Sequence, residues 1–513
     1  MNLIYDAWIP VRRASGRKEK VAPFEITDKK DPVLELAAPR PDFNGALIQF
    51  LIGLLQTTCA PESKKQWRDW FNNPPSPEEL KSKFEPVSFA FNLDGDGPRF
   101  MQDLTLDSDL KKTDKPESID KLLIDSPGGQ TEKFNTDHFI KRGRIERLCL
   151  ACALQALLTL QLNAPAGGAG HRVGLRGGGP VNTIILEDDL WKTIWSNVLD
   201  QIRFDNLAKP EKKEVADKFP WCGKTRTSEQ DRTTTSQNIH PDQVHWSLPR
   251  RIRLVLKQEE GRCDLCGEEG IIVREYFTKT YGVMYKGVIH PLTPTYEKAD
   301  KKKIEILSVH QHDAVGYKNW LGYVQTFTDG KKRVAEVINS ALDRRIFNFR
   351  LWAFGYDMDN MKASCWYEGV MPVITIEDSS KRQTYEADIV LLINAADSIA
   401  VSLRYAVKDA WFNPNQKKKI DLGFVVQRFW QETEADFYRL ISKLREEILA
   451  DRDGLSVKED WHKCLTSIAE RIFDDVSQAA TIDEINVKRV ADAWNGMKRN
   501  IYSKKVKQAL GLP

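Results

Sequence analysis

The chain has 513 residues, of which 41% are hydrophobic and 29% are charged, and its formal net charge is +3. These proportions are ordinary for a soluble globular protein, and the length is enough for a sizeable core and more than one domain. The small net charge leaves nucleic-acid binding open but excludes a uniformly basic surface, so any basic surface has to be local.

The N-terminus and the apolar runs predict a cytoplasmic protein. The opening residues, MNLIYDAWIPVRR, lack the basic-then-apolar order of a signal peptide. No apolar run approaches the roughly eighteen residues of a membrane span, so we expect no membrane partner. Disulfides are uncommon in the cytosol, and the eight cysteines therefore need another explanation.

Apolar and polar segments alternate along the first two hundred residues. Their periodicity and start signals predict the local structure. In chain order we expect a strand over 1–12 that ends at Pro10, a helix over 43–59 that starts at Asn44, a polar loop over 104–145, a helix over 148–162 and a strand over 181–186.

The next segment, up to about residue 376, is less regular. We expect a loop over 205–245, strands over 252–256 and 271–277, a helix over 332–353, and then a turn followed by strands within GYDMDNMKASCWYEGVMPVITI (355–376). Fourteen tryptophans are many, and their most common use is in an aromatic core.

After about residue 378 the pattern becomes helical. Apolar residues recur at helical spacing over 385–412, 425–450, 458–478 and 483–508. Four consecutive helices with short connections predict an up-down four-helix bundle. The fold class is therefore α+β, with an N-terminal domain over 1–376 and the bundle over 377–513. The last helix carries basic residues with no acid between them, which favours a solvated face over a partner or nucleic-acid contact: Lys498, Arg499, Lys504, Lys505 and Lys507.

One stretch, NAPAGGAGHRVGLRGGGPVNT (163–183), contains seven glycines. It does not match a phosphate-binding P-loop, because no glycine is followed by Gly-Lys at the required spacing. It also fails the dinucleotide fingerprint, because Val173 stands where the third glycine after Gly168 and Gly170 belongs. Glycine content alone favours a tight structural turn, with close approach of backbone to a ligand as the alternative.

Two C-x-x-C pairs supply four of the eight cysteines: Cys149 with Cys152, and Cys263 with Cys266. Four thiolates are a usual ligand set for tetrahedral Zn²⁺, and such a site would be closed and structural. About a hundred residues separate the pairs, far more than in a compact zinc ribbon, so two unrelated pairs remain the alternative. A redox role is less favoured, because neither pair follows a thioredoxin-like strand.

Taken together, these features resemble the large subunit (CasA) family of the type I-E CRISPR Cascade complex. The resemblance rests on LIYDAWIPV near the N-terminus, the two C-x-x-C pairs, the run APAGGAGHRVGLRGGGPVNT between them and the C-terminal helices. It covers essentially the whole chain.

The resemblance implies a DNA-recognition role without catalytic activity. The family recognises the protospacer-adjacent motif (PAM) in double-stranded DNA, helps to open the duplex for pairing with the guide RNA, and recruits a helicase–nuclease. The implied partners are the other Cascade subunits with their guide RNA, the target DNA and the helicase–nuclease effector. The resemblance also implies structural zinc held by the four paired cysteines.

The family's glycine-rich loop approaches the PAM from the minor groove, which is about 6 Å wide and admits little more than bare backbone. The residues that match this loop here are Gly167, Gly168 and Gly170, and His171 and Arg172 follow within reach of phosphates or the groove wall. Arg176 serves either the same purpose or a structural one.

A lysine of the family enters the same groove from the strand after the second cysteine pair. Lys279 is the best match in VREYFTKTYGVMYKG, although Thr280 could occupy the matching place, and Lys286 is the fallback.

Two further elements carry over from the family. Its wedge hairpin, which separates base pairs, corresponds to Met361, Lys362 and Ala363, with lysine in place of the expected glutamine. Its loop that docks on the guide-bearing subunits corresponds to GGQTEKFNTDHFIKRGR, where Phe134 and Asn135 match the anchor.

The alternative function is a metal-dependent hydrolase or nuclease. His310 and His312 form an H-x-H pair that could hold a metal ion on a strand. No H-E-x-x-H sequence and no carboxylate cluster accompanies the pair, and Asp313 alone is weak support. A scaffold without nucleic-acid contact is a third possibility.

Overall fold

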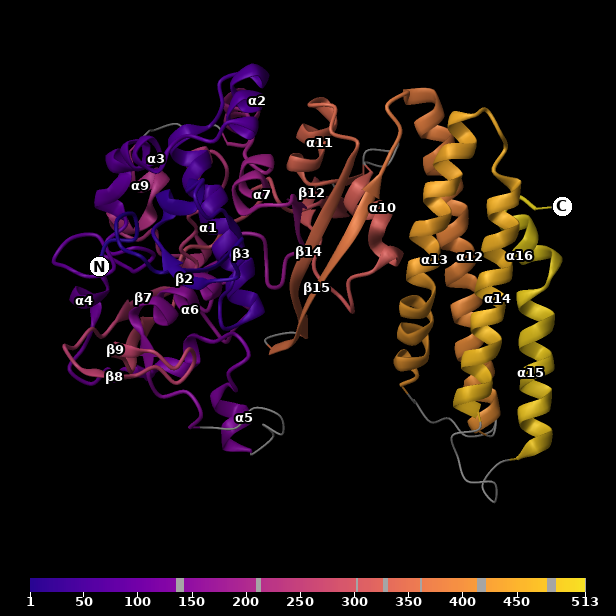
Figure 1. The fold of residues 1–513 in the computed structure, drawn as a ribbon. Coiled ribbons are helices and arrows are strands. Elements are labelled where there is room, and N and C mark those ends of the chain that lie inside the picture. The colour runs from indigo at the N-terminus through magenta and orange to yellow at the C-terminus, as the bar shows by residue number, and fades with distance from the viewer. Residues whose placement is uncertain are drawn as a thin grey trace. The chain divides into compact units, whose positions relative to one another are not determined.

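The computed structural model describes residues 1–134, 143–208, 214–300, 303–325, 331–359, 362–412, 421–477 and 486–512. It is a mixed α+β protein with a helical C-terminal region, which confirms the α+β prediction (Figure 1). The chain divides into two compact units. Unit 1 comprises Met1–Asp313, Thr326–Arg344 and Trp352–Glu368, and unit 2 comprises Ala314–Gln325, Arg345–Leu351 and Gly369–Pro513.

An antiparallel sheet of three strands, in the order β2-β1-β3, lies near the N-terminus of unit 1. Its strands are β1 (Ile9–Arg13), β2 (Lys18–Val21) and β3 (Val33–Leu36). The predicted strand over 1–12 is therefore wrong in its bounds, because pairing begins only at Ile9, opposite Val21. Residues before Ile9 instead bend, and Trp8 donates its ring N–H to the Leu3 carbonyl at 2.9 Å.

Two apolar helices, α1 (Pro41–Cys59) and α6 (Leu150–Asn163), contact each other in the core of unit 1. Both are buried nearly all round, which explains their continuous apolar sequence. Both predicted helices are confirmed, but α1 starts at Pro41, which suits the first helical position. Asn44 lies inside the helix, and its Oδ1 accepts the Ala38 N–H at 2.9 Å.

An aromatic cluster surrounds Phe50 of α1. The rings of Trp8, Phe91, Phe100 and Trp246 lie within 6.1 Å of the Phe50 ring, centroid to centroid. Such edge-to-face packing contributes beyond the burial of area. The prediction that tryptophan serves the core is confirmed for the fully buried examples, which are Trp8, Trp195, Trp221, Trp246, Trp320 and Trp461.

Four more three-stranded sheets follow, in the orders β4-β10-β7, β5-β9-β8, β12-β11-β13 and β15-β14-β6. Their strands are β4 (Glu117–Ser118), β5 (Leu148–Cys149), β6 (Asn182–Leu186), β7 (Arg251–Leu254), β8 (Glu260–Arg262), β9 (Glu269–Val273), β10 (Glu275–Lys279), β11 (Thr295–Asp300), β12 (Lys303–Ser308), β13 (Lys332–Arg333), β14 (Asn348–Asp359) and β15 (Lys362–Ile374). The predicted strand over 271–277 is thus two strands, β9 and β10, that belong to different sheets.

Short helices and 3-10 turns occur throughout the described ranges, including the segments 104–145 and 205–245 that were expected to be loops. The described helices and 3-10 turns of this kind are η1 (Pro23–Thr27), α2 (Lys64–Asn72), α3 (Pro77–Phe84), η2 (Glu85–Ala90), α4 (Leu106–Asp109), η3 (Ile119–Leu122), α5 (Gly129–Lys133), α7 (Leu190–Ser196), α8 (Gln201–Asp205), α9 (Val215–Lys218), η4 (Pro220–Cys222), η5 (Glu229–Asp231), η6 (Pro241–Val244), η7 (Tyr317–Asn319) and α10 (Trp320–Val324). Residues 214–245 are irregular but packed, since Phe219 and Trp221 join the aromatic cluster.

The predicted helix over 332–353 is wrong in its second half. A short helix, α11 (Glu336–Asp343), is followed by strand β14. Phe349, Leu351 and Ala353 are buried, whereas Asn348 and Arg350 are exposed. This alternation of buried and exposed side chains has the period of two that defines a strand. The helical pattern of α11 therefore does not continue into β14.

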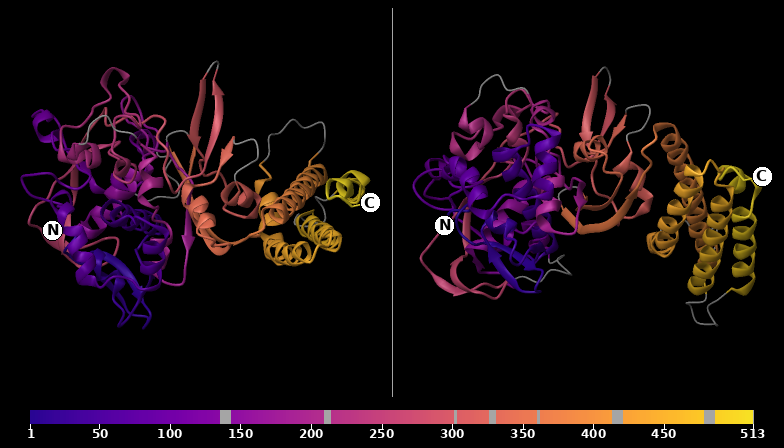
Figure 2. Two further views of the ribbon diagram at one scale, coloured as in Figure 1. Left: turned by 90° about the horizontal axis from the view of Figure 1, so that it is seen from above. Right: turned by 45° about the horizontal axis from the view of Figure 1, so that its top comes forward.

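Unit 2 is dominated by long helices. They are α12 (Ser379–Trp411), α13 (Gly423–Leu449), α14 (Leu455–Ser477), α15 (Val487–Ile501) and the short α16 (Lys504–Ala509). α12 contacts each of the others, and α13 contacts α14 (Figure 2). The predicted helix over 483–508 is broken after Ile501, because Ser503 starts a new helix by accepting the Val506 N–H.

Helix α12 meets the length and composition of a membrane span, with a mean hydropathy of 1.5 over its apolar window. Half of that window is buried inside the protein. Because α12 contacts α13, α14 and α15, its apolar residues serve helix packing within unit 2.

Candidate metal centre and nucleic-acid interface

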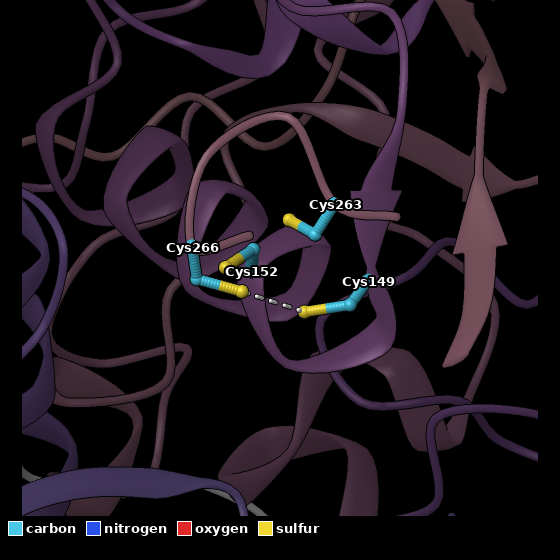
Figure 3. A group of neighbouring side chains, drawn as sticks. All are labelled: Cys149, Cys152, Cys263 and Cys266. Atoms are coloured by element: carbon cyan, nitrogen blue, oxygen red, sulfur yellow. Dashed lines mark hydrogen bonds between the residues drawn. The ribbon is translucent and has the colours of Figure 1, made fainter. Parts of the chain in front are cut away.

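The four paired cysteines converge in unit 1 (Figure 3). Cys149 ends β5 and caps α6, and Cys152 lies in the first turn of that helix. Cys263 directly follows β8, and Cys266 lies in the turn between β8 and β9. Because β5 and β8 both pair with β9, this small sheet brings together pairs that are far apart in sequence.

The geometry of the cluster fits a metal ion. All four sulfur atoms lie within 4.8 Å of one another, and those of Cys149 and Cys266 are 3.7 Å apart. Metal–sulfur bonds of about 2.3 Å in a tetrahedral site place sulfur atoms about 3.8 Å apart. Three of the cysteines are buried and Cys266 is half-buried, so the site is closed.

The electrostatics of the cluster also call for a cation. Hydrogen bonding to Cys149 and Cys263, together with burial, raises the pKa of the Cys152 thiol. Hydrogen bonds from Cys149 and Cys152 lower the pKa of Cys263. One thiolate is therefore stabilised by its protonated neighbours, whereas four thiolates at this distance would repel one another. Full deprotonation requires a positive ion between them.

Asp264, inside the second C-x-x-C pair, joins the two cysteine segments. Its carboxylate accepts the backbone N–H groups of Glu146 and Arg147 and the Arg147 guanidinium, each at 2.9 Å. Lys20 adds a positive charge beside the sulfur atoms. Burial lowers the Lys20 pKa, but the hydrogen bond to Glu268 and the attraction of the thiolates outweigh it and raise the pKa. The role of Asp264 was not predicted, because an aspartate in such a turn has many other uses.

The glycines at the C-terminal end of the 163–183 segment are structural. A Cβ atom on Gly179 would lie 2.1 Å from the Tyr356 carbonyl oxygen, and one on Gly174 would lie 2.8 Å from that of Leu162. Gly179 also has a φ of +70°. These positions exclude any side chain because backbone packs against them.

The glycines at the start of the segment form a different environment, which we call the glycine-loop tip (residues 167–171). Gly168 is exposed, and a Cβ atom there would meet no atom within 4 Å. Gly170 has a φ of +81°, and its carbonyl accepts the Tyr281 N–H at 2.7 Å. His171 is exposed, and burial of part of its ring together with the charge of Arg250 lowers its pKa. The tip therefore presents bare backbone beside the segment that follows β10.

The two arginines after the tip are engaged within the protein. Arg172 donates to the Ser228 hydroxyl at 2.7 Å and pairs with Asp231 at 3.3 Å. Arg176 is 4% exposed and donates to the Gln49 and Thr293 side chains at 2.6 and 3.0 Å. Burial lowers the Arg176 pKa to about 9. Arg176 is therefore structural, which decides between the two roles left open for it.

Both candidate groove lysines are in ion pairs. The Lys279 ammonium lies 2.5 Å from Asp114, and the side chain of Lys279 is 26% exposed. The hydrogen bond from Lys279 lowers the pKa of the Asp114 carboxyl. Lys286 is 63% exposed and pairs with Glu305 at 3.0 Å. Lys279 lies at the end of β10, next to Thr280 and Tyr281, whose side chains border Gly170.

The predicted wedge and docking residues are only partly described. Lys362 begins β15 and is exposed, and Ala363 after it is half-buried. Phe134 is 66% exposed, and the Lys133 ammonium lies 5.7 Å from its ring centroid. Met361 and Asn135 lie outside the described residues.

The H-x-H pair does not assemble a metal site among the described residues. His310 is used by the glycine segment: its Nε2 lies 3.2 Å from the Arg176 carbonyl oxygen, and its ring packs on Gly177. His312 is exposed and lies 3.7 Å from Asp357. In the described ranges, the cysteine cluster is the only group of three or more His, Cys, Asp or Glu residues close enough to hold an ion.

Three residues that the sequence analysis missed adopt left-handed backbone conformations beside the glycine-loop tip. They are Gln230, Asp231 and Tyr281, with φ values of 59°, 55° and 62°. The Ser228 N–H donates to the Tyr281 carbonyl at 3.1 Å, which links the two segments. Non-glycine residues rarely adopt this conformation, and such strain concentrates at functional sites. Gln230 and Tyr281 carry no sequence signal for this conformation, and Asp231 carries only the weak preference that aspartate shares with asparagine.

Fold and site together define a large mixed α+β protein with a closed four-cysteine cluster at the N-terminus of α6 and an exposed glycine loop that follows the C-terminus of the same helix. Residues 2–472 match the family model of CRISPR-associated protein Cse1. The chain therefore belongs to the Cse1 family, which confirms the resemblance noted from its sequence, since Cse1 and CasA are two names for one protein.

Solved structures share the fold across nearly the full length. Thermobifida fusca Cse1 is 15% identical with a TM-score of 0.73, covering 100% of this chain and 98% of that one. Thermus thermophilus CasA (Cse1) is 17% identical with a TM-score of 0.68, covering 97% and 99%. A chain of a CRISPR RNA-guided surveillance complex is 16% identical with a TM-score of 0.67, covering 98% and 99%.

Proposed function

We propose that this chain is the large subunit of a type I-E Cascade complex, an RNA-guided antiviral surveillance complex of the cytoplasm. It recognises the PAM in double-stranded DNA through the minor groove, helps to open the duplex for guide-RNA pairing and recruits a helicase–nuclease, with no catalysis of its own. Family membership and the likeness in fold to a chain of a surveillance complex support this role.

The observation that carries the proposal is the glycine-loop tip. Gly168 has open space on its Cβ side, so it is not needed for packing, unlike Gly174 and Gly179. A glycine without a packing reason in an exposed turn favours close approach of an external surface. The minor groove, about 6 Å wide, is such a surface, and it is read mainly by its width and acceptor pattern. Gly167, Gly170, His171 and Arg172 surround this point and complete the proposed PAM-contacting surface.

We propose Zn²⁺ as the ion of the cysteine cluster. Four thiolates form a soft, closed, tetrahedral ligand set, which is typical of structural zinc. Cys149, Cys152, Cys263 and Cys266 would hold it, and the bound ion would supply cross-linking rather than reaction chemistry. The cluster joins the N-terminus of α6 to β8 and β9. Helix α6 leads directly into the glycine segment. By stabilising α6, zinc would support the PAM-contacting surface.

We also propose that residues 377–513 form a domain whose helices α12, α13, α14 and α15 are an up-down four-helix bundle, preceded by a domain over 1–376. The contacts of α12 with the other three helices support this. The bundle is the proposed region for recruiting the helicase–nuclease. Phe134, exposed on unit 1, is the proposed anchor for the guide-bearing subunits, together with Asn135.

Duplex-DNA binding tests the proposal. The affinity of the purified chain for PAM and scrambled-PAM duplexes is measured with and without its Cascade ribonucleoprotein partners, at one salt concentration. We expect PAM-dependent binding in the assembled complex only. Binding that ignores both PAM and partners contradicts the proposal, and Mg²⁺- or Mn²⁺-dependent cleavage abolished by His310→Ala would instead favour the hydrolase.

Asp114→Asn is expected to increase affinity for PAM duplex by roughly two- to fivefold, because loss of this ion pair frees the Lys279 ammonium to contact phosphate. The matched control is Glu305→Gln, which removes the same charge and frees Lys286. Both variants are titrated on PAM and scrambled duplexes. A gain restricted to Glu305→Gln would make Lys286 the groove lysine.

Lys362→Ala is expected to leave PAM binding unchanged and to slow strand opening by roughly fivefold, if attraction of the exposed ammonium to phosphate contributes about 1 kcal/mol. Unstacking a base step costs a few kcal/mol. A residue of the wedge therefore affects the rate of strand opening. Opening is followed by the fluorescence of a base analogue next to the PAM. Ser364→Ala, at another exposed position of β15, is the control. A normal opening rate for Lys362→Ala would remove Lys362 from the wedge.

A further inference from the structure

Arg250 lies next to Gly167 of the glycine-loop tip and contacts the residues that lead into it. Its backbone is fixed by α6, since its N–H donates to Gln161 Oε1 at 3.0 Å and its carbonyl accepts Gln161 Nε2 at 2.9 Å. Its Nη2 donates to the Pro165 carbonyl at 2.6 Å, two residues before the tip. The side chain is therefore held at one position relative to the loop.

Arg250 differs from the other arginines of its segment in having no acidic partner. Arg251 pairs with Asp103 and Asp109, and Arg253 pairs with Asp107 at 3.2 Å. Arg250 makes no ion pair with any residue in the described ranges, and its Nε has no hydrogen-bond partner there. Burial lowers the Arg250 pKa only to about 10, so the guanidinium stays charged at neutral pH. Keeping an unpaired charge half-buried costs free energy, and a bound anion would offset that cost.

Gly167 lies beside this guanidinium, next to the His171 side chain. A Cβ atom on Gly167 would lie 3.4 Å from Arg250 Nη1, in van der Waals contact with it. Any side chain at this position would therefore cover the guanidinium. Next to it, the exposed ring of His171 is close enough for the Arg250 charge to lower its pKa. Arg250 is half-buried, whereas His171 and Gly168 are exposed, so this positive charge lies close to the surface that carries Gly168.

We propose that Arg250 binds a backbone phosphate of the duplex beside the PAM and so sets the depth and register of the glycine loop in the groove. Arginine suits this task because its planar donors match phosphate oxygens, and phosphate contacts position a protein on DNA without reading sequence. The inference rests on the proposed function, because it takes duplex DNA as the ligand of this face.

The test is a salt titration of duplex binding by the assembled complex with Arg250→Gln. Each phosphate neutralised contributes about 0.9 to the slope of log K against log salt. We expect Arg250→Gln to lower that slope by about 0.9 and PAM-duplex affinity by roughly tenfold, with the PAM-to-scrambled ratio retained. Arg250→Lys keeps the charge and is expected to keep the slope. Arg274→Gln removes the same charge from an arginine paired with Glu259 at 2.9 Å and is expected to change neither quantity.

Two outcomes would overturn the inference. One is an unchanged slope for Arg250→Gln in a complex of normal thermal stability. The other is an equal loss of slope in Arg250→Lys, because a contact with phosphate depends on the charge whereas support of the Pro165 carbonyl does not. Failure of the proposed function is distinguishable, since it appears as equal binding of PAM and scrambled duplexes by the unsubstituted complex.

Discussion

Cys263→Ser is expected to abolish metal binding and to lower the thermal stability of unit 1. The structural zinc sites of small domains contribute on the order of 10 kcal/mol, and removing one ligand forfeits several kcal/mol of that. For a unit of this size, such a loss lowers the midpoint of unfolding by roughly 10 °C. Metal content by mass spectrometry and thermal unfolding by calorimetry measure the two effects.

Cys365→Ser is the matched control, because Cys365 is exposed and distant in sequence from both C-x-x-C pairs. It is expected to retain one metal ion per chain and an unchanged midpoint. The same argument predicts that acid releases the ion, since protons compete with it for the thiolates. Unchanged metal content in Cys263→Ser would show that the cluster is not the metal site.

The parts of the fold that the sequence predicted are those with a strong local pattern. α1, α6 and the long helices of unit 2 carry apolar residues at helical spacing over many turns, so periodicity identifies them. The strand β14 was mistaken for helix because its alternation extends over few residues and follows the helical residues of α11. The break after Ile501 was missed because Ser503 is a weak signal without the observed hydrogen bond to Val506.

At the candidate site, the sequence identified the chemistry of residues but not their partners. The four cysteines were recognised from spacing, whereas Asp264 was not, because the donors to its carboxylate are backbone N–H groups 117 and 118 residues away. Arg172 and Lys279 were expected to face a nucleic acid, and the structure pairs them with Asp231 and Asp114. Long-range ion pairs leave no local sequence pattern. The sequence therefore does not show which lysines and arginines already have an acidic partner.

Gly168→Leu is expected to reduce the preference of the assembled complex for PAM over scrambled duplex by roughly tenfold or more, without destabilising the chain. A groove about 6 Å wide accepts bare backbone but not an added isobutyl group. The fold is expected to tolerate leucine, because a Cβ atom on Gly168 meets nothing within 4 Å and the residue is exposed. Binding constants on both duplexes and the midpoint of thermal unfolding measure the two effects.

Substitution of Gly168 is more informative than substitution of Gly167 or Gly170, because changes at those two positions would also disturb the fold. A Cβ atom on Gly167 would lie 2.2 Å from that of His171, and Gly170 has a φ of +81°. Gly97→Leu is the matched control, since Gly97 is also exposed and also has open space around its Cβ side. If Gly168→Leu weakened PAM and scrambled duplex equally, the tip would contact DNA without reading the PAM. If it matched Gly97→Leu in every measurement, the tip would lie outside the DNA interface, and the open space at Gly168 would need a different explanation.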